Sequence, residues 1–396
     1  MVSDDCRPEL PNYGQDYIQA PNLAKLAARG LTFMHAYCQQ SICSPSRNSF
    51  MSGHRPQVTK TWNFVNDFRQ ELPFVMSFPQ YFKHHNYTVL GHSKLYHPGH
   101  PQNYDEPLSW SQDNPQTLNP NPPGDVPKQH QPGSYFYPGD GRDEDHPSGN
   151  PAYPLPHQPS GCGYFDVCPS NLSRAHFMDY TTATKAIDTM GMMVAKKKPF
   201  FMGVGLIRPH LPFVVPLDMW AKYENTDIKQ PGSALPPVGY VNISLNDQIF
   251  AGNKTFCPDG TDPNATCPSV ERRAIVTSDD TTPFHPETPA TTRFLRHGYY
   301  AAVSFMDEQV GRLVDRVEEL GKTDETIMIF HGDHGWHLGE QGLWTKKTVF
   351  ELGTRVPLII AAPHITASHG HTTLHLAELV DVCELSAAAA QLHMDC

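Results

Sequence analysis

The chain has 396 residues, of which 39% are apolar and 18% charged, and its formal net charge is −11. This composition is that of a globular protein with one large domain or two, and it excludes an intrinsically disordered chain. No apolar run approaches the roughly 18 residues that a membrane helix needs, so we expect no membrane span. We also expect no nucleic-acid partner, because an acidic protein binds a polyanion only through a local cationic pocket.

The compartment is indicated by sequons and cysteines, since no signal peptide is visible at the start of the chain. Five N-glycosylation sequons occur, at Asn86, Asn171, Asn242, Asn253 and Asn264. Nine cysteines are many for a cytosolic enzyme. The spacing favours local disulfides between Cys162 and Cys168 and between Cys257 and Cys267, with a zinc site as the other interpretation. We expect a lysosomal or secreted glycoprotein whose leader is not present in this sequence.

Helices and strands are expected to alternate along the chain. Short buried strands are predicted over 199–206, 326–330 and 356–363. Helices are predicted over 22–31, closed by Gly30, and over 301–320, where apolar residues form one stripe. Residues 98–159 hold 15 prolines and are expected to form a long surface loop, and residues 225–290 also read as loop. This order predicts an α/β fold with a large, mostly parallel mixed sheet sandwiched by helices.

Acidic side chains lie at two places that such a sheet brings together. Asp4 and Asp5 lie near the amino terminus, and Asp333 and His334 directly follow a predicted strand. Because ligands gather at the carboxyl ends of parallel strands, these side chains are candidates for a site that binds a hard cation through oxygen. Taken alone, the first pair is more simply a solvated terminus and the second a polar turn.

Basic side chains in three further motifs are candidates for catalysis. They are Lys94 and His97 in SKLYHPG, His210 in RPHLPF and Lys346 in LWTKKTVFE. Each alone is more often a surface or hydrogen-bonding residue than a catalytic one, because a single match carries little information.

The segment CSPSRNSFMSG, residues 43–53, is far more specific. Cys43 followed by Pro45 and Arg47 resembles the signature of the sulfatase family, in which the cysteine is oxidised after translation to Cα-formylglycine. The resemblance implies that a formylglycine-generating enzyme reads Pro45 and Arg47 during maturation, and it argues against a free thiol or a disulfide at Cys43. Ser52 departs mildly from the signature, which more usually has threonine.

The resemblance extends over nearly the whole chain, through six motifs in the family's order. It implies hydrolysis of sulfate esters by the hydrated aldehyde, of which one hydroxyl attacks sulfur and the other then releases the sulfate. It also implies one Ca²⁺ per chain, with Asp4, Asp5, Cys43, Asp333 and His334 as its ligands.

Roles for the remaining candidates follow from the same resemblance. Arg47 would support the diol and the carboxylates around the metal. Lys94 and Lys346 would contact the sulfate oxygens, where charge develops. His97 would act as the base and His210 as the acid that protonates the leaving alcohol. Ser93 departs from the family, which usually has glycine before the active-site lysine.

The expected substrate is a sulfated glycan or a small sulfate ester, of the iduronate 2-sulfate type. Another sulfated polysaccharide is the alternative, because pocket walls come from loops such as 98–159. A phosphate or phosphonate ester hydrolase of the same superfamily and a non-catalytic truncated fragment are two further interpretations. We assign residues 1–380 to the sulfatase catalytic domain and residues 381–396 to a remnant or divergent C-terminus, with the family's C-terminal subdomain truncated or missing.

Overall fold

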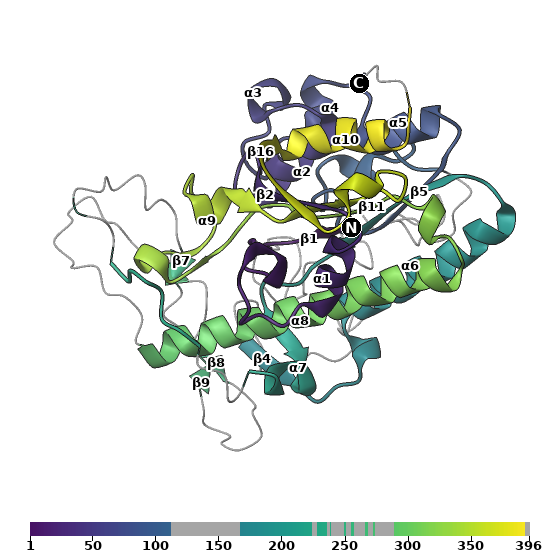
Figure 1. Ribbon diagram of the computed structural model, residues 1–396. Coiled ribbons are helices and arrows are strands. Elements are labelled where there is room, and N and C mark those ends of the chain that lie inside the picture. The colour runs from purple at the N-terminus through teal and green to yellow at the C-terminus, as the bar shows by residue number, and fades with distance from the viewer. Residues whose placement is uncertain are drawn as a thin grey trace, which may run out of the picture.

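A mixed eight-stranded sheet forms the centre of the protein (Figure 1). The computed structural model describes residues 1–111, 167–223, 228–235, 238, 249–250, 255–256, 266–267, 272–273 and 289–392. The strands of the sheet are β1 (Val2–Ser3), β2 (Leu31–Tyr37), β3 (Thr88–Ser93), β5 (Phe200–Leu206), β11 (Met328–Gly332), β14 (Arg355–Val356), β15 (Leu358–Ala361) and β16 (His371–Glu378). Their order is β14-β2-β15-β11-β1-β5-β3, and β16 pairs with β2.

The sheet contains both parallel and antiparallel strand pairs, and the two kinds lie mostly in different halves. β11, β1, β5 and β3 run parallel to one another, and β16 runs parallel to β2. β15 is antiparallel to β11 and β2, and β14 is antiparallel to β2. The parallel half therefore directs the carboxyl ends of β1, β5, β3 and β11 to one edge, where their loops meet.

Helices cover both faces of the sheet. On one face lie α1 (Pro21–Ala27), α6 (Met178–Lys196) and α8 (Pro289–Glu319), and on the other α2 (Cys43–Ser52), α5 (Phe78–His84) and α10 (Val382–Ala389) (Figure 1). Each face buries its own apolar cluster between sheet and helices. The predicted α/β fold, a mixed sheet sandwiched by helices, is confirmed.

Shorter elements complete the described part of the chain. The helices are α3 (Pro56–Thr59), α4 (Phe68–Glu71), α7 (Leu217–Ala221) and α9 (Glu351–Thr354). The strands are β4 (Val167–Ser170), β6 (Phe213–Pro216), β7 (Ile249–Phe250), β8 (Thr255–Phe256), β9 (Thr266–Cys267), β10 (Arg272–Arg273), β12 (His337–Leu338) and β13 (Trp344–Thr345). Within 225–290, predicted as loop, the described pieces thus include four two-residue strands.

The predicted elements differ from the observed ones mainly at their ends. α1 ends at Ala27, and the chain turns at Gly30, where a Cβ atom would lie 2.3 Å from the carbonyl oxygen of Ile360. α8 begins at Pro289, well before the predicted start. The strand predicted over 356–363 is interrupted by Pro357, which has no N–H for the ladder and separates β14 from β15.

Several predicted features lie outside the described residues. The greater part of the Pro-rich segment, 112–159, is among them, as are Cys162, Cys257 and the sequons at Asn242, Asn253 and Asn264. Asn86 and Asn171 are described and exposed. None of the helices in the described ranges is long and apolar enough to cross a membrane.

Candidate active site

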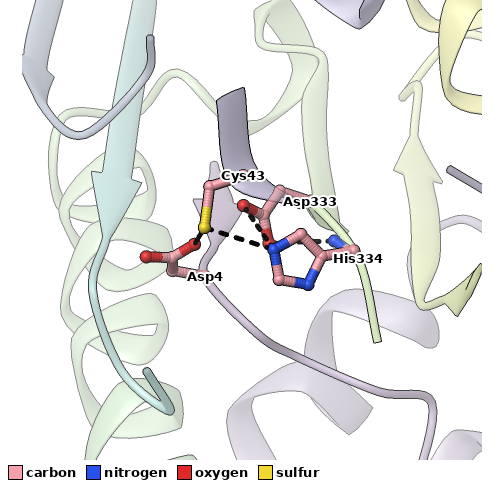
Figure 2. Close-up of side chains that lie close together, drawn as sticks. All are labelled: Asp4, Cys43, Asp333 and His334. Carbon is pink, nitrogen blue, oxygen red and sulfur yellow. Dashed lines mark hydrogen bonds and ion pairs between the residues drawn. The ribbon is translucent and has the colours of Figure 1, made fainter. Parts of the chain in front are cut away.

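Cys43 lies at the first position of α2, at the edge where the parallel strands end (Figure 2). Its Sγ atom lies 3.5 Å from Oδ1 of Asp4, 3.3 Å from Nε2 of His334 and 3.0 Å from Nζ of Lys346. All four side chains are buried. Residues that are far apart in sequence thus converge on one sulfur atom, at the amino end of a ten-residue helix whose N–H groups and dipole favour negative charge.

The carboxylates come from two adjacent parallel strands. Asp4 and Asp5 follow β1, and Asp333 follows β11. Oδ1 of Asp333 accepts hydrogen bonds from the backbone N–H groups of Asp5 and His334, at 3.0 Å and 2.9 Å. Asp5 has a φ of 62°, the left-handed conformation that a non-glycine residue seldom adopts. These bonds fix the turn that directs both neighbouring carboxylates into one site.

Arg47 forms ion pairs with the carboxylates of both Asp4 and Asp333. Its Nε donates to Oδ2 of Asp333 at 3.0 Å, and its Nη2 donates to Oδ1 of Asp4 at 3.2 Å. Its Nη1 donates to the carbonyl oxygens of Lys94 and Leu95. The side chain is completely buried, so all its charge is balanced inside the protein.

Two lysines approach the cluster from different loops. Lys94, directly after β3, donates to Oδ2 of Asp4. Lys346, directly after β13, donates to Oδ1 of Asp5 at 2.7 Å and lies near Cys43. Ser93, before Lys94, has a φ of 59°, a conformation in which the glycine usual in the family would be unstrained.

The hydrogen bonds of the histidines determine which ring nitrogen carries a proton. Nδ1 lies 3.0 Å from the Gly335 carbonyl oxygen in His334, 2.7 Å from that of Leu211 in His210 and 3.1 Å from that of Pro98 in His97. Because a carbonyl only accepts, Nδ1 is the donor in each ring. In the neutral form, Nε2 therefore keeps a lone pair.

The two neighbouring carboxylates, Asp4 and Asp5, have pKa values shifted in opposite directions. Burial alone would raise the pKa of Asp4, but Lys94 and Arg47 outweigh it and hold this pKa well below its usual range. Burial raises the pKa of Asp5 well above its usual range, and Asp4 adds to this effect while Lys346 opposes it. Burial also raises the pKa of the Cys43 thiol.

The histidine pKa values are all lowered by burial. Those of His97 and His210 lie well below the usual range, with added effects of Lys94 on His97 and Lys346 on His210. That of His334 is lowered as well. All three rings are thus held neutral, and a neutral Nε2 is available as a base or as a metal ligand.

The carboxylate oxygens and the imidazole nitrogen of the cluster could together bind a divalent cation. Nε2 of His334 lies 3.3 Å from Oδ1 of Asp5 and 3.5 Å from Oδ2 of Asp333. Each of these three atoms can serve as a metal ligand, and Lys346 and Arg47 already donate to the two oxygens. Oδ2 of Asp5 is buried without a hydrogen-bond partner, and Nε2 of His210 lies 3.7 Å from it. Metal-ligating atoms of Asp4, Cys43, Asp333 and His334 lie within 4.8 Å of one another.

All ten site residues predicted from the sequence are buried at this edge. Eight form the contacts described above around Cys43. His210 lies beside Asp5, and its ring nitrogen lies within 4.8 Å of ligand atoms of Asp4, Asp5 and Cys43. The ring of His97 packs against Phe64, with ring centroids 4.7 Å apart.

Two residues that hold the site were not predicted. The hydroxyl of Tyr299 on α8 donates to the carbonyl oxygen of Asp5 at 2.8 Å and accepts from the N–H of Arg7. The carboxylate of Asp179 on α6 accepts from the N–H groups of Ile207 and Arg208, before His210. Both lie on helices with ordinary amphipathic patterns, so the sequence contained no local signal for either.

The Sulfatase family model matches residues 2–389 of the chain. Among curated proteins, iduronate 2-sulfatase of Homo sapiens is 31% identical over 376 residues, with 93% of this chain and 60% of that protein covered. Choline-sulfatase of Rhizobium meliloti is 25% identical, with 90% of this chain and 60% of that protein covered. The chain thus spans about 60% of the length of these relatives.

Solved structures of similar fold include two with different substrates in their names. The phosphonate monoester hydrolase of Agrobacterium radiobacter has a TM-score of 0.65 at 17% identity, with 99% of this chain and 73% of that chain covered. A protein solved with its substrate D-glucosamine-2-N,6-O-disulfate has a TM-score of 0.66 at 18% identity, with 100% of this chain and 76% of that chain covered. At these identities the likeness concerns the fold alone.

Proposed function

The chain belongs to the sulfatase family, and we propose that it hydrolyses sulfate esters of a sulfated glycan with residue 43 as the nucleophile. The observation that supports this most directly is the position of Cys43. Its Sγ atom lies at the helix amino terminus, within 3.5 Å of a carboxylate, an imidazole and an ammonium group. A nucleophile at this point would carry its developing charge beside a cation and the amino end of α2.

The proposal includes conversion of Cys43 to Cα-formylglycine. The burial-raised pKa of the Cys43 thiol leaves the unmodified cysteine a poor nucleophile. A hydrated formylglycine would supply two hydroxyl groups, one for attack on sulfur and one for release of sulfate. Nζ of Lys346, 3.0 Å from Sγ, is placed to stabilise an ionised oxygen there.

We further propose Ca²⁺ as the cation, held by Asp4, Asp5, residue 43, Asp333 and His334. Bound there, it would favour the ionised nucleophile and contact sulfate oxygens. Three carboxylates already face three cationic side chains in this cluster. A divalent cation would leave an excess of positive charge, which suits an anionic sulfate ester. His334 is the least usual of these ligands, because calcium prefers oxygen.

The two remaining histidines are proposed for proton transfer. The lone pair on Nε2 and the lowered pKa of His97 suit a base. His210 would donate a proton to the leaving alcohol, which requires its imidazolium form. Its pKa is lowered by burial first and by Lys346 next. A bound sulfate anion would act in the opposite direction and favour the protonated ring.

The proposed substrate class is a glycan with iduronate 2-sulfate. This rests on the human iduronate 2-sulfatase being 31% identical over most of this chain. A relative that is 25% identical is a choline-sulfatase, so choline sulfate is the substrate to compare with the sulfated glycan. The five sequons and nine cysteines motivate a lysosomal or secreted location, with the disulfides and glycans that such a compartment allows.

The decisive experiment is expression of the chain together with a formylglycine-generating enzyme. We expect the peptide that contains residue 43 to be lighter than the unmodified peptide with its thiol. We also expect it to react with a hydrazide probe. We expect an aryl sulfate to be hydrolysed and Cys43→Ala to abolish turnover. Cys38→Ala is the matched control, because Cys38 is also buried but its sulfur lies 4.0 Å from the Gly353 carbonyl oxygen and outside the cluster.

Substrate is then tested by comparing kcat/KM for an iduronate 2-sulfate disaccharide, a glucosamine 6-sulfate disaccharide and choline sulfate. A preference for the first supports the proposed class. An aryl phosphonate hydrolysed faster than the aryl sulfate, or an unmodified Cys43 in an active enzyme, would contradict the sulfatase mechanism.

A further inference from the structure

The segment that carries Lys346 is a turn with an unusual backbone, residues 345–348, which we call the Lys346 turn. Thr345 has a φ of 68° and Lys347 a φ of 70°, so both neighbours of Lys346 adopt the left-handed conformation. This conformation is uncommon for a non-glycine residue and an outlier for a β-branched one such as Thr345. Residues in such conformations persist only where the surrounding structure holds them, so the turn needs contacts that fix it.

Ser41 holds the turn from the segment that leads into α2. Its carbonyl oxygen accepts from the N–H of Lys347 at 3.0 Å, and its hydroxyl donates to the carbonyl oxygen of Thr348. Ser41 is buried and lies two residues before Cys43. The two bonds therefore tie Lys346 to the chain segment that carries Cys43, whose Sγ atom lies 3.0 Å from Nζ of Lys346.

His337 holds the turn from the neighbouring strand. It pairs with Thr345 where β12 meets β13, and its Nε2 lies 2.7 Å from the hydroxyl oxygen of Thr348. The side chains of His337 and Thr348 are both buried. The ring of His337 also packs edge-on against Phe350, with ring centroids 6.3 Å apart. His337 is thus paired with the first residue of the turn and hydrogen-bonded to the last.

The surroundings of His337 determine which of its nitrogens carries the proton. Its Nδ1 is buried and has no hydrogen-bond partner among the described residues. Proteins leave a buried N–H group without an acceptor more rarely than a buried lone pair without a donor, so we assign the proton to Nε2. Nε2 therefore donates to Thr348, whereas in His334 the proton lies on Nδ1. Burial lowers the pKa of His337 to about 4, so the ring is neutral near neutral pH.

We propose that His337 and Ser41 are positioning residues for Lys346, which act on catalysis through the Lys346 turn and not by contact with the substrate. This inference rests on the proposed function, in which Lys346 stabilises an ionised oxygen at residue 43. The bond from His337 to Thr348 and the two bonds of Ser41 hold the Lys346 ammonium beside that position. Without them the turn relaxes toward ordinary φ values, and the ammonium moves away from residue 43.

The test removes the bond between His337 and Thr348 from either side. Thr348→Val keeps the shape of the side chain but lacks the accepting hydroxyl, and His337→Leu removes the donor. We expect each to lower kcat for an aryl sulfate by about 10-fold or more and to change KM less, because Lys346 acts on charge that develops in the transition state. His337→Gln should restore most of the activity, since its amide N–H can take the place of Nε2. Thr189→Val is the matched control: Thr189 is buried on α6, and its hydroxyl donates to the carbonyl oxygen of Lys185.

A double-variant cycle with Lys346→Met separates positioning from general damage. If His337 acts through Lys346, Thr348→Val should lower kcat by less than about twofold in the Lys346→Met background. Equal losses in the two backgrounds would overturn the proposal. So would a Thr348→Val enzyme as active as Thr189→Val, or a His337→Gln enzyme no better than His337→Leu.

Amide hydrogen exchange tests the turn without reference to activity. The amide of Lys347, which donates to Ser41, should exchange about 10-fold faster or more in Thr348→Val than in Thr189→Val. The amide of Ile207, which donates to Asp179 elsewhere in the fold, should exchange equally in both. Unchanged exchange at Lys347 would overturn the proposal. Faster exchange there in a protein without any sulfatase activity would support the anchoring of the turn and count against the proposed function alone.

Discussion

Nζ of Lys346 lies 3.0 Å from Sγ of Cys43, although the two residues are 303 positions apart in the sequence. The same ammonium donates to Asp5, and these neighbours raise its pKa well above the usual range despite the opposing effect of burial. Lys346 therefore stays charged across the physiological pH range. Its charge is available both to the carboxylate and to any anion formed at residue 43.

Lys346→Met should lower kcat/KM for an aryl sulfate by about 100-fold or more, because a buried charge beside the developing anion is lost. Lys347→Met is the matched control, since that side chain is only partly buried and has no part in the cluster. Activity is measured on formylglycine-containing protein. A Lys346→Met enzyme as active as the control would remove this residue from the site.

Arg47→Met should destabilise the fold by about 3–5 kcal/mol, because it leaves Asp4 and Asp333 buried without their shared cation. Chemical denaturation with urea measures the difference in the free energy of unfolding. Arg55→Met is the control: Arg55 pairs with Glu378 on an exposed surface, and no measurable change is expected there. Similar effects of both substitutions would show that the buried pairs are not important for stability.

Calcium should stabilise the protein, and chelation should remove activity that added Ca²⁺ restores. Asp5→Asn should abolish the rise in the unfolding midpoint that Ca²⁺ produces, because it removes one ligand charge. Asp188→Asn on the exposed face of α6 should leave that rise intact. Differential scanning fluorimetry measures the unfolding midpoint with Ca²⁺, with Mg²⁺ and with chelator. Full activity in excess chelator would refute the cation site.

The fold should lose stability on acidification through buried neutral histidines such as His92. Burial lowers its pKa from 6.5 to about 4, and its Nε2 has no hydrogen-bond partner. Below pH 6.5 the unfolded chain binds a proton that the folded chain does not, so stability falls between pH 6.5 and 4. At pH 5 the loss is about 2 kcal/mol. In His92→Gln, the difference in unfolding free energy between pH 7 and pH 5 should shrink by this amount, and an unchanged difference would contradict the prediction.

The ion pair of Arg7 with Glu340 links the loop after β1 to the loop before Lys346. Arg7 Nη2 lies 2.9 Å from Glu340, whose carboxylate also accepts from Arg296 at 3.0 Å. Glu340→Met should cost about 3–5 kcal/mol, because it leaves two buried guanidinium groups with Glu9 as their shared carboxylate partner. The double variant Arg7→Met, Glu340→Met should cost less than the sum of the single changes, by about 1 kcal/mol or more. Additive urea unfolding energies would mean that the two residues act independently.

The sequence predicted the elements whose apolar pattern is strong and local, but not those fixed by distant partners. β5 and β11 are short apolar runs, and the meeting of Asp333 after β11 with Asp4 and Asp5 after β1 follows from the parallel arrangement. β16 was not predicted because most of its side chains are exposed, so that it has no apolar face. It is held by pairing with β2, more than 330 residues earlier. β3 and α6 were not predicted either.

At the site, the residue types were recognisable but their geometry was not. The turn at Asp5 depends on bonds to Asp333 and Tyr299, which no local pattern encodes. The split between the lowered pKa of Asp4 and the raised pKa of Asp5 depends on which cation each carboxylate meets. Two adjacent identical residues are therefore chemically different only in the folded protein.

Every residue of α2, from Cys43 to Ser52, is buried, and Arg47 has no exposed surface. Ser46 Oγ donates to the Asp333 carbonyl oxygen, and Asn48 Oδ1 accepts from the N–H of Phe68, so the helix is bonded to its surroundings along its length. An enzyme that reads Pro45 and Arg47 in order to oxidise Cys43 cannot reach them in the native state. The proposed oxidation of Cys43 would therefore have to precede folding, and a chain that folds unmodified would lack the proposed nucleophile.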